Sequence, residues 1–394
     1  MTGIGAVCAL GLDVQTTWAR LLSGSPSIGK LHTIDTSRLN PGIGAEVAGF
    51  EPTAFFTRSH LNQLDRASQF ALVAAREAMA QAALPLGGNE RRRGVVFAAC
   101  MGQVTLDDTY RMFHGENAQR LPPLTVPRVM PNAACAQISM AWGLRGPSFA
   151  VSSACASANH AMAQAASLIR AGQLDVAVTG GADAPLSPGT LKGWEGLRVF
   201  APDACRPFSA DRAGLVPGEG AAVLVLEGWD HAESRGAAIL AEFAGAGMTA
   251  DGGDLTAPDP AGAADAMAMA MDDAGLRPEE VGYVNAHGTG TRMNDPSECQ
   301  ALHRVFGTRP PPVSSSKSML GHCMAAAGAV EAVATVMALR TGVLPPTAGF
   351  TTPDPMCDVD CIPNAARRAQ AGAALSNSLA FGGLNAVVAF RAAA

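Results

Sequence analysis

The sequence predicts an α/β protein made of two similar halves, and three observations lead to this prediction. Short apolar runs alternate along the chain with longer segments rich in Ala and Leu, a pattern typical of helices layered on sheet. One run, residues 222–226, is apolar at every position, as expected for a strand that helices cover on both faces. Two stretches of sequence also recur later in the chain, in the same order.

The expected elements follow this alternation. Five short runs are predicted strands: residues 94–98, 175–179, 222–226, 282–285 and 386–390. Four longer runs are predicted helices: residues 67–83, 156–171, 262–274 and 324–340. Because strands and helices alternate, we expect mostly parallel sheet with helices on its faces.

The recurring stretches indicate a duplication. Residues 151–166 and 313–328 are identical at seven of sixteen positions, and each leads from a Val-Ser-Ser run into a predicted helix. A second pair, residues 218–226 and 382–390, follows at a similar offset, with a glycine-rich turn before an apolar strand. We place the boundary in the polar stretch after the first strand of this pair. The predicted halves are therefore residues 1–228 and 229–394.

Composition excludes several classes of function. The net charge of −6 argues against a nucleic-acid partner, which requires clustered Lys and Arg. The longest apolar stretch, residues 323–339, contains Glu331 and many Ala and Gly residues, so we expect no membrane partner. The basic residues 91–93 are either a solvated loop or a docking site for an acidic partner, and the first reading is preferred.

Cysteine usage indicates a reduced protein. Nine cysteines are scattered along the chain and no two form a CxxC pair, so neither a disulfide framework nor a zinc site is expected. The first residues also lack the basic region of a signal peptide. We therefore expect a cytoplasmic protein.

Cys155 is a candidate nucleophile because it stands where an apolar run ends and the predicted helix 156–171 begins. The positive end of the helix dipole favours a thiolate and lowers the pKa of a nearby thiol. The small neighbouring residues leave room for a substrate, and free backbone N–H groups at the helix start can receive an oxyanion. A buried structural role, which is common for free cysteines, fits this position equally well, and we expect it for the other eight.

Two histidines lie beside glycines after other predicted strands. His287 follows the run 282–285 within Asn-Ala-His-Gly-Thr-Gly-Thr, and His322 ends the sequence Ser-Lys-Ser-Met-Leu-Gly-His. Lone histidines are more often structural, but ligands of α/β proteins gather at the carboxyl ends of strands, which favours catalysis. Lys317 and Glu331 would be costly to bury without a partner. We expect either a charged network around His322 or ordinary surface charges.

Eight segments of the chain match one family in order. They are residues 143–147, 153–158, 180–183, 206–209, 214–221, 287–291, 316–322 and 377–385. Together they resemble the β-ketoacyl-acyl-carrier-protein synthases of the thiolase superfamily, nearly from end to end. Residues 153–161 and 201–212 most resemble rhizobial nodulation ketosynthases and similar polyketide-type enzymes. The resemblance implies the thiolase fold, in which duplicated α/β halves form a layered αβαβα arrangement.

The resemblance also implies a reaction. Cys155 would take an acyl chain from a carrier-protein thioester, and malonyl-carrier protein would then lose CO₂ and attack that acyl group. His287 and His322 match the residues that stabilise the enolate, and the backbone N–H groups of Cys155 and Phe381 match an oxyanion hole.

Further positions carry over in the same way. Thr289 and Thr291 match residues that contact the phosphopantetheine arm. Lys317 and Glu331 match a charged pair that orders the site around His322. Asp295 matches another acidic position, for which we expect a structural role.

Partners and cofactors follow from the same resemblance. No metal and no cofactor of its own are implied, because phosphopantetheine arrives on an acyl carrier protein. The chain is expected to form a homodimer, or a heterodimer with a homologue of the chain-length-factor type. The expected pathway is fatty acid or type II polyketide biosynthesis.

Two departures and three rival interpretations remain. Leu379 replaces an aromatic gate and Leu384 replaces a common threonine, which leaves gating and chain preference open.

The rivals are a non-condensing chain-length-factor-like partner, a thiolase acting on coenzyme A esters, and a scaffold without activity. Retention of Cys155 with both histidines disfavours the first and the third. The HGTGT segment and the Lys317–His322 spacing favour the synthase over the thiolase.

Overall fold

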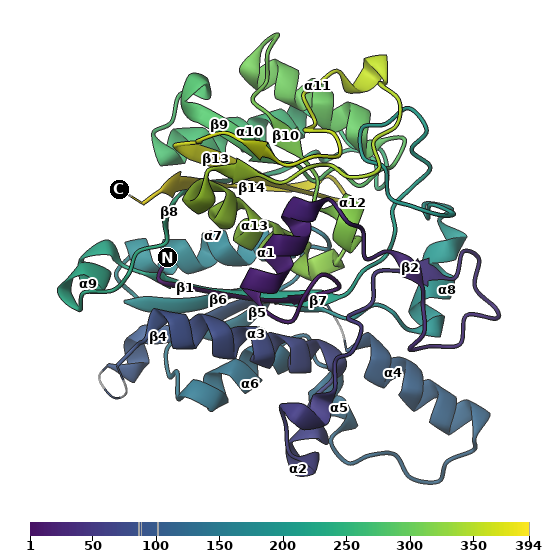
Figure 1. The fold of residues 1–394 in the computed structure, drawn as a ribbon. Helices are drawn as coiled ribbons and strands as arrows, with labels where there is room; N and C mark the ends of the chain where they lie inside the picture. Colours follow the sequence, from purple (N-terminus) through teal and green to yellow (C-terminus); the bar gives the residue numbers. More distant parts are fainter. Residues whose placement is uncertain (86, 88, 101, 394) are drawn as a thin grey trace.

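Two five-stranded sheets form the framework of the computed structural model, which describes residues 1–85, 87, 89–100 and 102–393 (Figure 1). The order in the first sheet is β1 (Gly3–Cys8), β7 (Gly220–Glu227), β6 (Val176–Asp183), β4 (Arg93–Ala99) and β5 (Ser148–Val151). The order in the second is β8 (Ala241–Ala250), β14 (Leu384–Ala392), β13 (Ala373–Ala380), β9 (Val281–Asn285) and β10 (Val313–Ser314). The two orders correspond strand for strand, as expected for duplicated halves.

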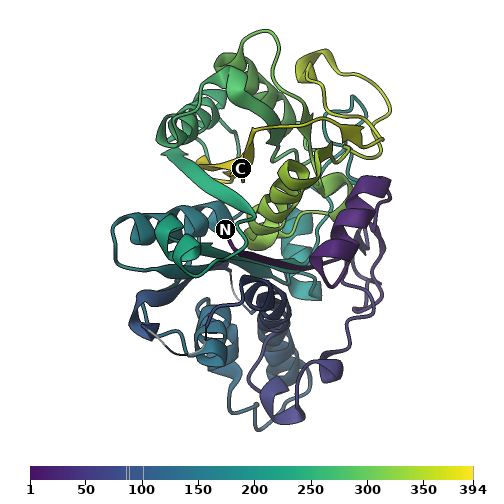
Figure 2. The ribbon, with the colours of Figure 1, turned by 60° about the vertical axis from the view of Figure 1, so that its left-hand side comes forward.

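Helices complete five layers. On the outer face of the first sheet lie α3 (Arg66–Ala82) and α6 (Ala133–Trp142), and α10 (Pro260–Ala274) covers the outer face of the second, beside α11 (Asn294–Phe306). Between the sheets lie α7 (Ser157–Arg170) and α13 (Ala327–Thr341), as Figures 1 and 2 show. This arrangement confirms the predicted αβαβα fold class.

The remaining elements are short and mostly connect the layers. They are α1 (Val14–Ser23), α2 (Arg58–Leu61), α4 (Gln103–Tyr110), α5 (Thr125–Val129), α8 (Pro188–Gly196), α9 (Trp229–Ser234) and α12 (Lys317–Leu320), with strand pairs β2 (Gly29–Lys30)–β3 (Ile43–Gly44) and β11 (Val343–Leu344)–β12 (Arg367–Arg368).

Small residues allow the layers to approach closely. In β1, a Cβ atom on Gly5 would lie 2.0 Å from the carbonyl oxygen of Ala74 in α3, so the contact requires glycine. In the middle layer α13 is buried on nearly every face. The stretch Met324–Thr341 is long and apolar enough to cross a membrane by length and composition, but 83% of it is buried inside the protein, as in a core helix.

Each sheet is mixed, so the expectation of mostly parallel sheet is wrong. In each sheet two strand pairings are parallel and two are antiparallel. One physical reason is the turn Phe381–Gly383, which joins β13 to β14 directly and leaves no room for a crossover helix.

The predicted elements are all present, with shifted ends. The two-residue strands β2, β3, β11 and β12 were missed, and so were five strands of the two large sheets. These are β1, β5, β8, β10 and β13. Of the basic residues 91–93, Arg92 forms an ion pair with Asp175 at 2.6 Å and Arg93 begins β4. The Arg92 side chain is 36% exposed, so it is solvated as expected, and its ion pair links the turn before β4 to the residue that precedes β6.

Candidate active site

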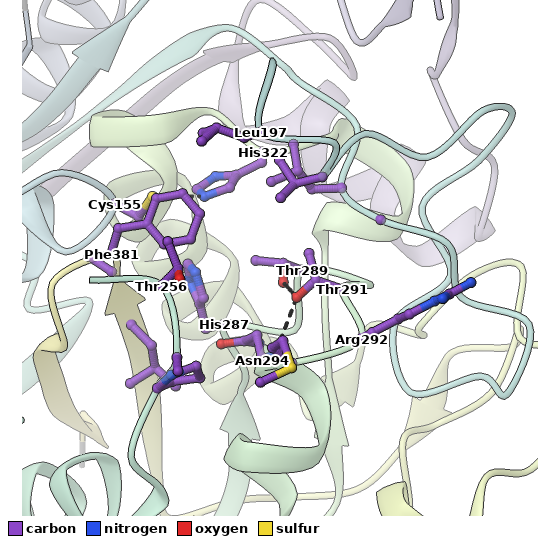
Figure 3. Close-up of a pocket in the computed structure, with 18 of the residues that line it drawn as sticks. Cys155, Leu197, Thr256, His287, Thr289, Thr291, Arg292, Asn294, His322 and Phe381 are labelled. Carbon is purple, nitrogen blue, oxygen red and sulfur yellow. Dashed lines mark hydrogen bonds between the residues drawn. The ribbon is translucent and has the colours of Figure 1, made fainter. Parts of the chain in front are cut away.

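Three side chains predicted from the sequence converge between the two halves. Cys155 lies between β5 and α7, His287 follows β9, and His322 follows α12. The Cys155 sulfur and one ring nitrogen of each histidine all lie within 4.8 Å of one another (Figure 3). All three side chains are buried. Cys155 thus shares one site with two histidines that lie 132 and 167 positions further along the chain.

A tight turn presents Cys155 to the pocket. Ala154 has a left-handed backbone with φ of +50°, which reverses the chain between β5 and α7. The Ser157 hydroxyl accepts the backbone N–H of Ser153 at 2.8 Å and donates to the Ala154 carbonyl at 2.6 Å. These hydrogen bonds fix the turn, and the small residues around it leave the sulfur accessible from the pocket.

Hydrogen bonds determine which nitrogen of each imidazole carries the proton. The Nδ1 atom of His322 accepts the backbone N–H of Met324 at 3.2 Å. The Nδ1 atom of His287 lies 3.3 Å from the Lys317 ammonium, which can only donate. Both Nδ1 atoms are therefore acceptors, and in the neutral rings the proton sits on Nε2. The Nε2 atom of His322 lies 3.1 Å from the Cys155 sulfur, so it donates toward that atom.

Burial controls the ionisation of all three groups. Desolvation raises the pKa of Cys155 to about 12, although the positive charge of Lys317 acts in the opposite direction. Desolvation, and then Lys317, lower the pKa values of His287 and His322 well below the ordinary range, so both imidazoles are neutral at pH 7. The expectation that the helix dipole makes Cys155 a thiolate is wrong for this resting state, because the cost of burying the charge is larger.

The charged pair behind the site orders His287. The side chains of Lys317 and Glu331 are fully buried and form an ion pair, which excludes the surface-charge alternative. Lys317 also donates to the carbonyl oxygen of His287 at 2.7 Å. The charged pair was expected to order the site around His322. This expectation is corrected, because Lys317 makes its direct contacts with His287. The backbone of His322 is held by Val216, whose carbonyl accepts its N–H at 2.7 Å.

Two acidic residues of α11 hold the HGTGT segment, and one of them was missed. Glu298 accepts the backbone N–H groups of His287 and Gly288, both at 2.8 Å, and is fully buried. Asp295 accepts the N–H of Gly290 at 3.1 Å, and burial raises its pKa to about 6. The signal for Glu298 was present in the sequence, since an acid at i+3 from Asp295 shares its helix face.

A pocket of about 680 Å³ opens in front of the sulfur and receives the other predicted residues. Thr289, Thr291, Leu379 and Phe381 all line it, and the two threonine hydroxyls lie 2.9 Å apart. Among the described residues, the backbone N–H groups of Cys155 and Phe381 donate to no carbonyl or side-chain oxygen. Both groups are thus free to bind a substrate oxygen.

Further pocket residues were not singled out from the sequence. Trp194 stacks on Phe381 with ring centroids 6.0 Å apart, and the carbonyl of Leu255 accepts the N–H of Gly382 at 2.7 Å. Trp194 lies on α8 and Leu255 on the loop after β8, and their approach to residues 379–383 depends on tertiary packing, which no local pattern reports. Arg198 and Arg292 also line this pocket.

The Cys155, His287 and His322 side chains also have the composition of a zinc site, which binds thiolate and imidazole. Two features oppose a cation here. Each available Nε2 atom carries a proton, and the Lys317 ammonium lies 3.3 Å from the His287 ring. The site is therefore better suited to stabilising an anion.

Comparison with known proteins agrees with this geometry. The family profile "Beta-ketoacyl synthase, N-terminal domain" matches residues 1–232, and "Beta-ketoacyl synthase, C-terminal domain" matches residues 240–351. The chain is 47% identical to Nodulation protein E of Rhizobium sp. (strain N33), over 99% of this chain and 98% of that protein. It is 38% identical to 3-oxoacyl-[acyl-carrier-protein] synthase 2 of Staphylococcus aureus, over 99% of this chain and 100% of that protein. Among solved structures, "The ishigamide ketosynthase/chain length factor" superposes with a TM-score of 0.94 at 34% identity, covering 100% of this chain and 98% of that one.

Proposed function

This chain belongs to the β-ketoacyl synthase family of condensing enzymes, and from that membership we propose a decarboxylative Claisen condensation between an acyl group on Cys155 and malonyl-acyl-carrier protein. The product is a β-ketoacyl-carrier protein. The observation that carries the proposal is the pair of imidazoles beside the Cys155 sulfur, both neutral and both with a proton on Nε2.

The first stage transfers the acyl group. The sulfur of Cys155 attacks the thioester carbonyl, and the oxyanion accepts hydrogen bonds from the backbone N–H groups of Cys155 and Phe381. The pantetheine thiol leaves and takes up one proton, in balance with the proton that Cys155 gives up. The Nε2–H of His322, 3.1 Å from the sulfur, stabilises the negative charge on sulfur as it attacks.

The second stage forms the carbon–carbon bond. The malonyl thioester oxygen accepts hydrogen bonds from the Nε2–H groups of His287 and His322 while the malonyl carboxylate leaves as CO₂. The electron pair of the broken bond becomes an enolate, which attacks the acyl carbonyl on Cys155. Cys155 departs as a thiolate and regains a proton from solvent. Neutral imidazoles can play this role, because the contacts at Nδ1 leave the one ring proton on Nε2, where it can be donated to the malonyl oxygen.

The substrate would enter through the pocket that Thr289 and Thr291 line, with the phosphopantetheine arm against their hydroxyls. The enzyme would need no cofactor of its own and would act in the cytoplasm, in fatty acid or type II polyketide biosynthesis. The name of the staphylococcal relative includes acyl-carrier protein, which supports the proposed class of partner.

An exposed apolar surface beside the edge strand β5 supports dimerisation. Four elements contact one another in series along this face, from α4 through α5 and α6 to β5. Exposed side chains on it include Tyr110, Val126, Met140 and Phe149. We place the partner here, either a second copy or a homologue of the chain-length-factor type, because an unpaired strand edge with apolar neighbours favours strand pairing.

The acylation of Cys155 tests the proposal. The protein is incubated with acyl-carrier proteins of several chain lengths, and intact mass spectrometry measures the adduct. The wild type is expected to gain one acyl group and the Cys155→Ala variant none. Adding malonyl-carrier protein should then release CO₂ and discharge the adduct. A wild type that no chain type acylates would overturn the assignment.

A further inference from the structure

The described residues around the pocket in front of Cys155 give it positive charge and no carboxylate. Its lining includes Arg198 and Arg292, and none of the described residues that line it is Asp or Glu. In the whole chain, 34 acidic residues outnumber 28 basic ones. The overall composition therefore does not explain why no acidic residue is found among the described residues of the pocket lining. A pocket with this charge suits a ligand that carries a negative group.

Within the part of the chain that the structure describes, Arg292 has no partner to neutralise it. Among the described residues, no hydrogen bond or ion pair involves its guanidinium, and its side chain is exposed. Two arginines of the segment 206–212, which contacts the carbonyl of Thr291, do have acidic partners. Arg206 pairs with Asp203 at 2.6 Å, and Arg212 pairs with Asp354 at 2.5 Å. The guanidinium of Arg292 is therefore available to an outside anion.

The position of Arg292 indicates which part of a ligand it meets. Figure 3 shows Cys155 and Arg292 on opposite sides of the pocket, with Thr289 and Thr291 between them and the guanidinium pointing away from the sulfur. A ligand with its thioester at Cys155 and its arm along the threonines would bring its far end to Arg292. In a phosphopantetheine thioester that far end is a phosphate.

We propose that Arg292 is a specificity-determining residue that binds the phosphate of the phosphopantetheine arm at the mouth of the pocket. This inference rests on the proposed function. The planar guanidinium offers paired N–H donors that match two phosphate oxygens, and such charge-assisted pairs are stronger than neutral hydrogen bonds. Carrier protein and coenzyme A both present this phosphate, so the guanidinium recognises the group they share.

The test compares two small substrates that differ only in the phosphate, acyl-phosphopantetheine and acyl-pantetheine. The rate of Cys155 acylation is measured by intact mass over a range of concentrations. The wild type is expected to prefer the phosphorylated substrate by about tenfold in kcat/KM, mainly through KM. Arg292→Ala should abolish this preference, so that the ratio of kcat/KM for the two substrates falls to about one. Arg304→Ala is the matched control, because Arg304 is exposed on α11 and does not line the pocket, and it should retain the preference.

The same variants are then assayed with acyl-carrier protein and acyl-coenzyme A. Arg292→Ala should lower kcat/KM for both by a similar factor. A loss confined to the carrier protein would mean that Arg292 contacts the carrier's own surface, and this would overturn the inference. So would a phosphate preference that survives in Arg292→Ala or is absent from the wild type. If no substrate acylates the wild type, the proposed function itself fails, which is a separate result.

Discussion

Replacing Glu298 by glutamine should damage both the stability of the protein and the second stage of the reaction. The carboxylate accepts the N–H of His287 and an amide N–H of Asn377 on one oxygen and the N–H of Gly288 on the other. Glutamine retains only one acceptor oxygen. If that oxygen keeps the first pair of hydrogen bonds, its NH₂ group faces the buried N–H of Gly288, and two donors oppose each other.

The magnitude follows from these contacts. The hydrogen bonds from His287 and Asn377 then go to a neutral acceptor instead of a charged one, a loss of about 1 kcal/mol each, and the buried N–H of Gly288 is left without an acceptor, which costs about 1–3 kcal/mol. We expect a total near 3–5 kcal/mol, measured as the shift of the urea unfolding transition. His287 should also be displaced, so malonyl decarboxylation should fall about a hundredfold while Cys155 acylation changes only a few-fold.

The matched control is Glu279→Gln, because Glu279 is largely exposed and its ion pair with Arg277 is on the surface. This variant should stay within about 0.5 kcal/mol of the wild type. The reasoning about Glu298 would be refuted by a Glu298→Gln variant that unfolds like the wild type and releases CO₂ at the same rate.

Three further predictions concern other parts of the site and fold. His322→Ala should retain measurable acylation by acyl-carrier protein yet lose malonyl decarboxylation, and CO₂ release at the wild-type rate would contradict the role given to this imidazole. Because burial raises the pKa of Cys155 to about 12, its alkylation by iodoacetamide should accelerate steadily from pH 6 to pH 9 as the thiolate fraction grows, and a rate that levels off near pH 7 would show that the thiolate forms more easily. Gly5→Ala should destabilise the protein by about 3 kcal/mol in urea unfolding because its Cβ would meet the Ala74 carbonyl, whereas Gly372→Ala, with open space around its Cβ position, should have little effect.

Local patterns in the sequence predicted four helices, five strands and the three side chains Cys155, His287 and His322, because those signals are local. The run 222–226 is apolar throughout and is a buried strand, and the HGTGT segment stands directly after β9. The missed strands lack such a signal. β5 is half exposed at a sheet edge, and β1 contains two glycines that are needed for contact with α3 rather than for strand formation.

The ionisation of Cys155 could not be predicted from its neighbours in the sequence. Its place before α7 suggested a lowered pKa, but the pKa depends on how much water reaches the sulfur. That quantity depends on residues from the other half, such as His322, whose Nε2 atom lies 3.1 Å from the sulfur. The same holds for Lys317, whose contact with His287 requires α12 and the loop after β9 to lie side by side.

The duplication explains why these distant residues meet. The segment that follows β5 contains Cys155, and the corresponding segment after β10 contains Lys317 and His322. Because β5 and β10 occupy equivalent edges of two sheets that pack on the same middle layer, the related segments approach each other between the halves. The first copy then supplies the proposed nucleophile, Cys155, while the second supplies His322 as the proposed hydrogen-bond donor and Lys317 as a buried cation. A single half would contain a cysteine without its imidazoles, so the proposed chemistry requires both copies to be folded and packed together.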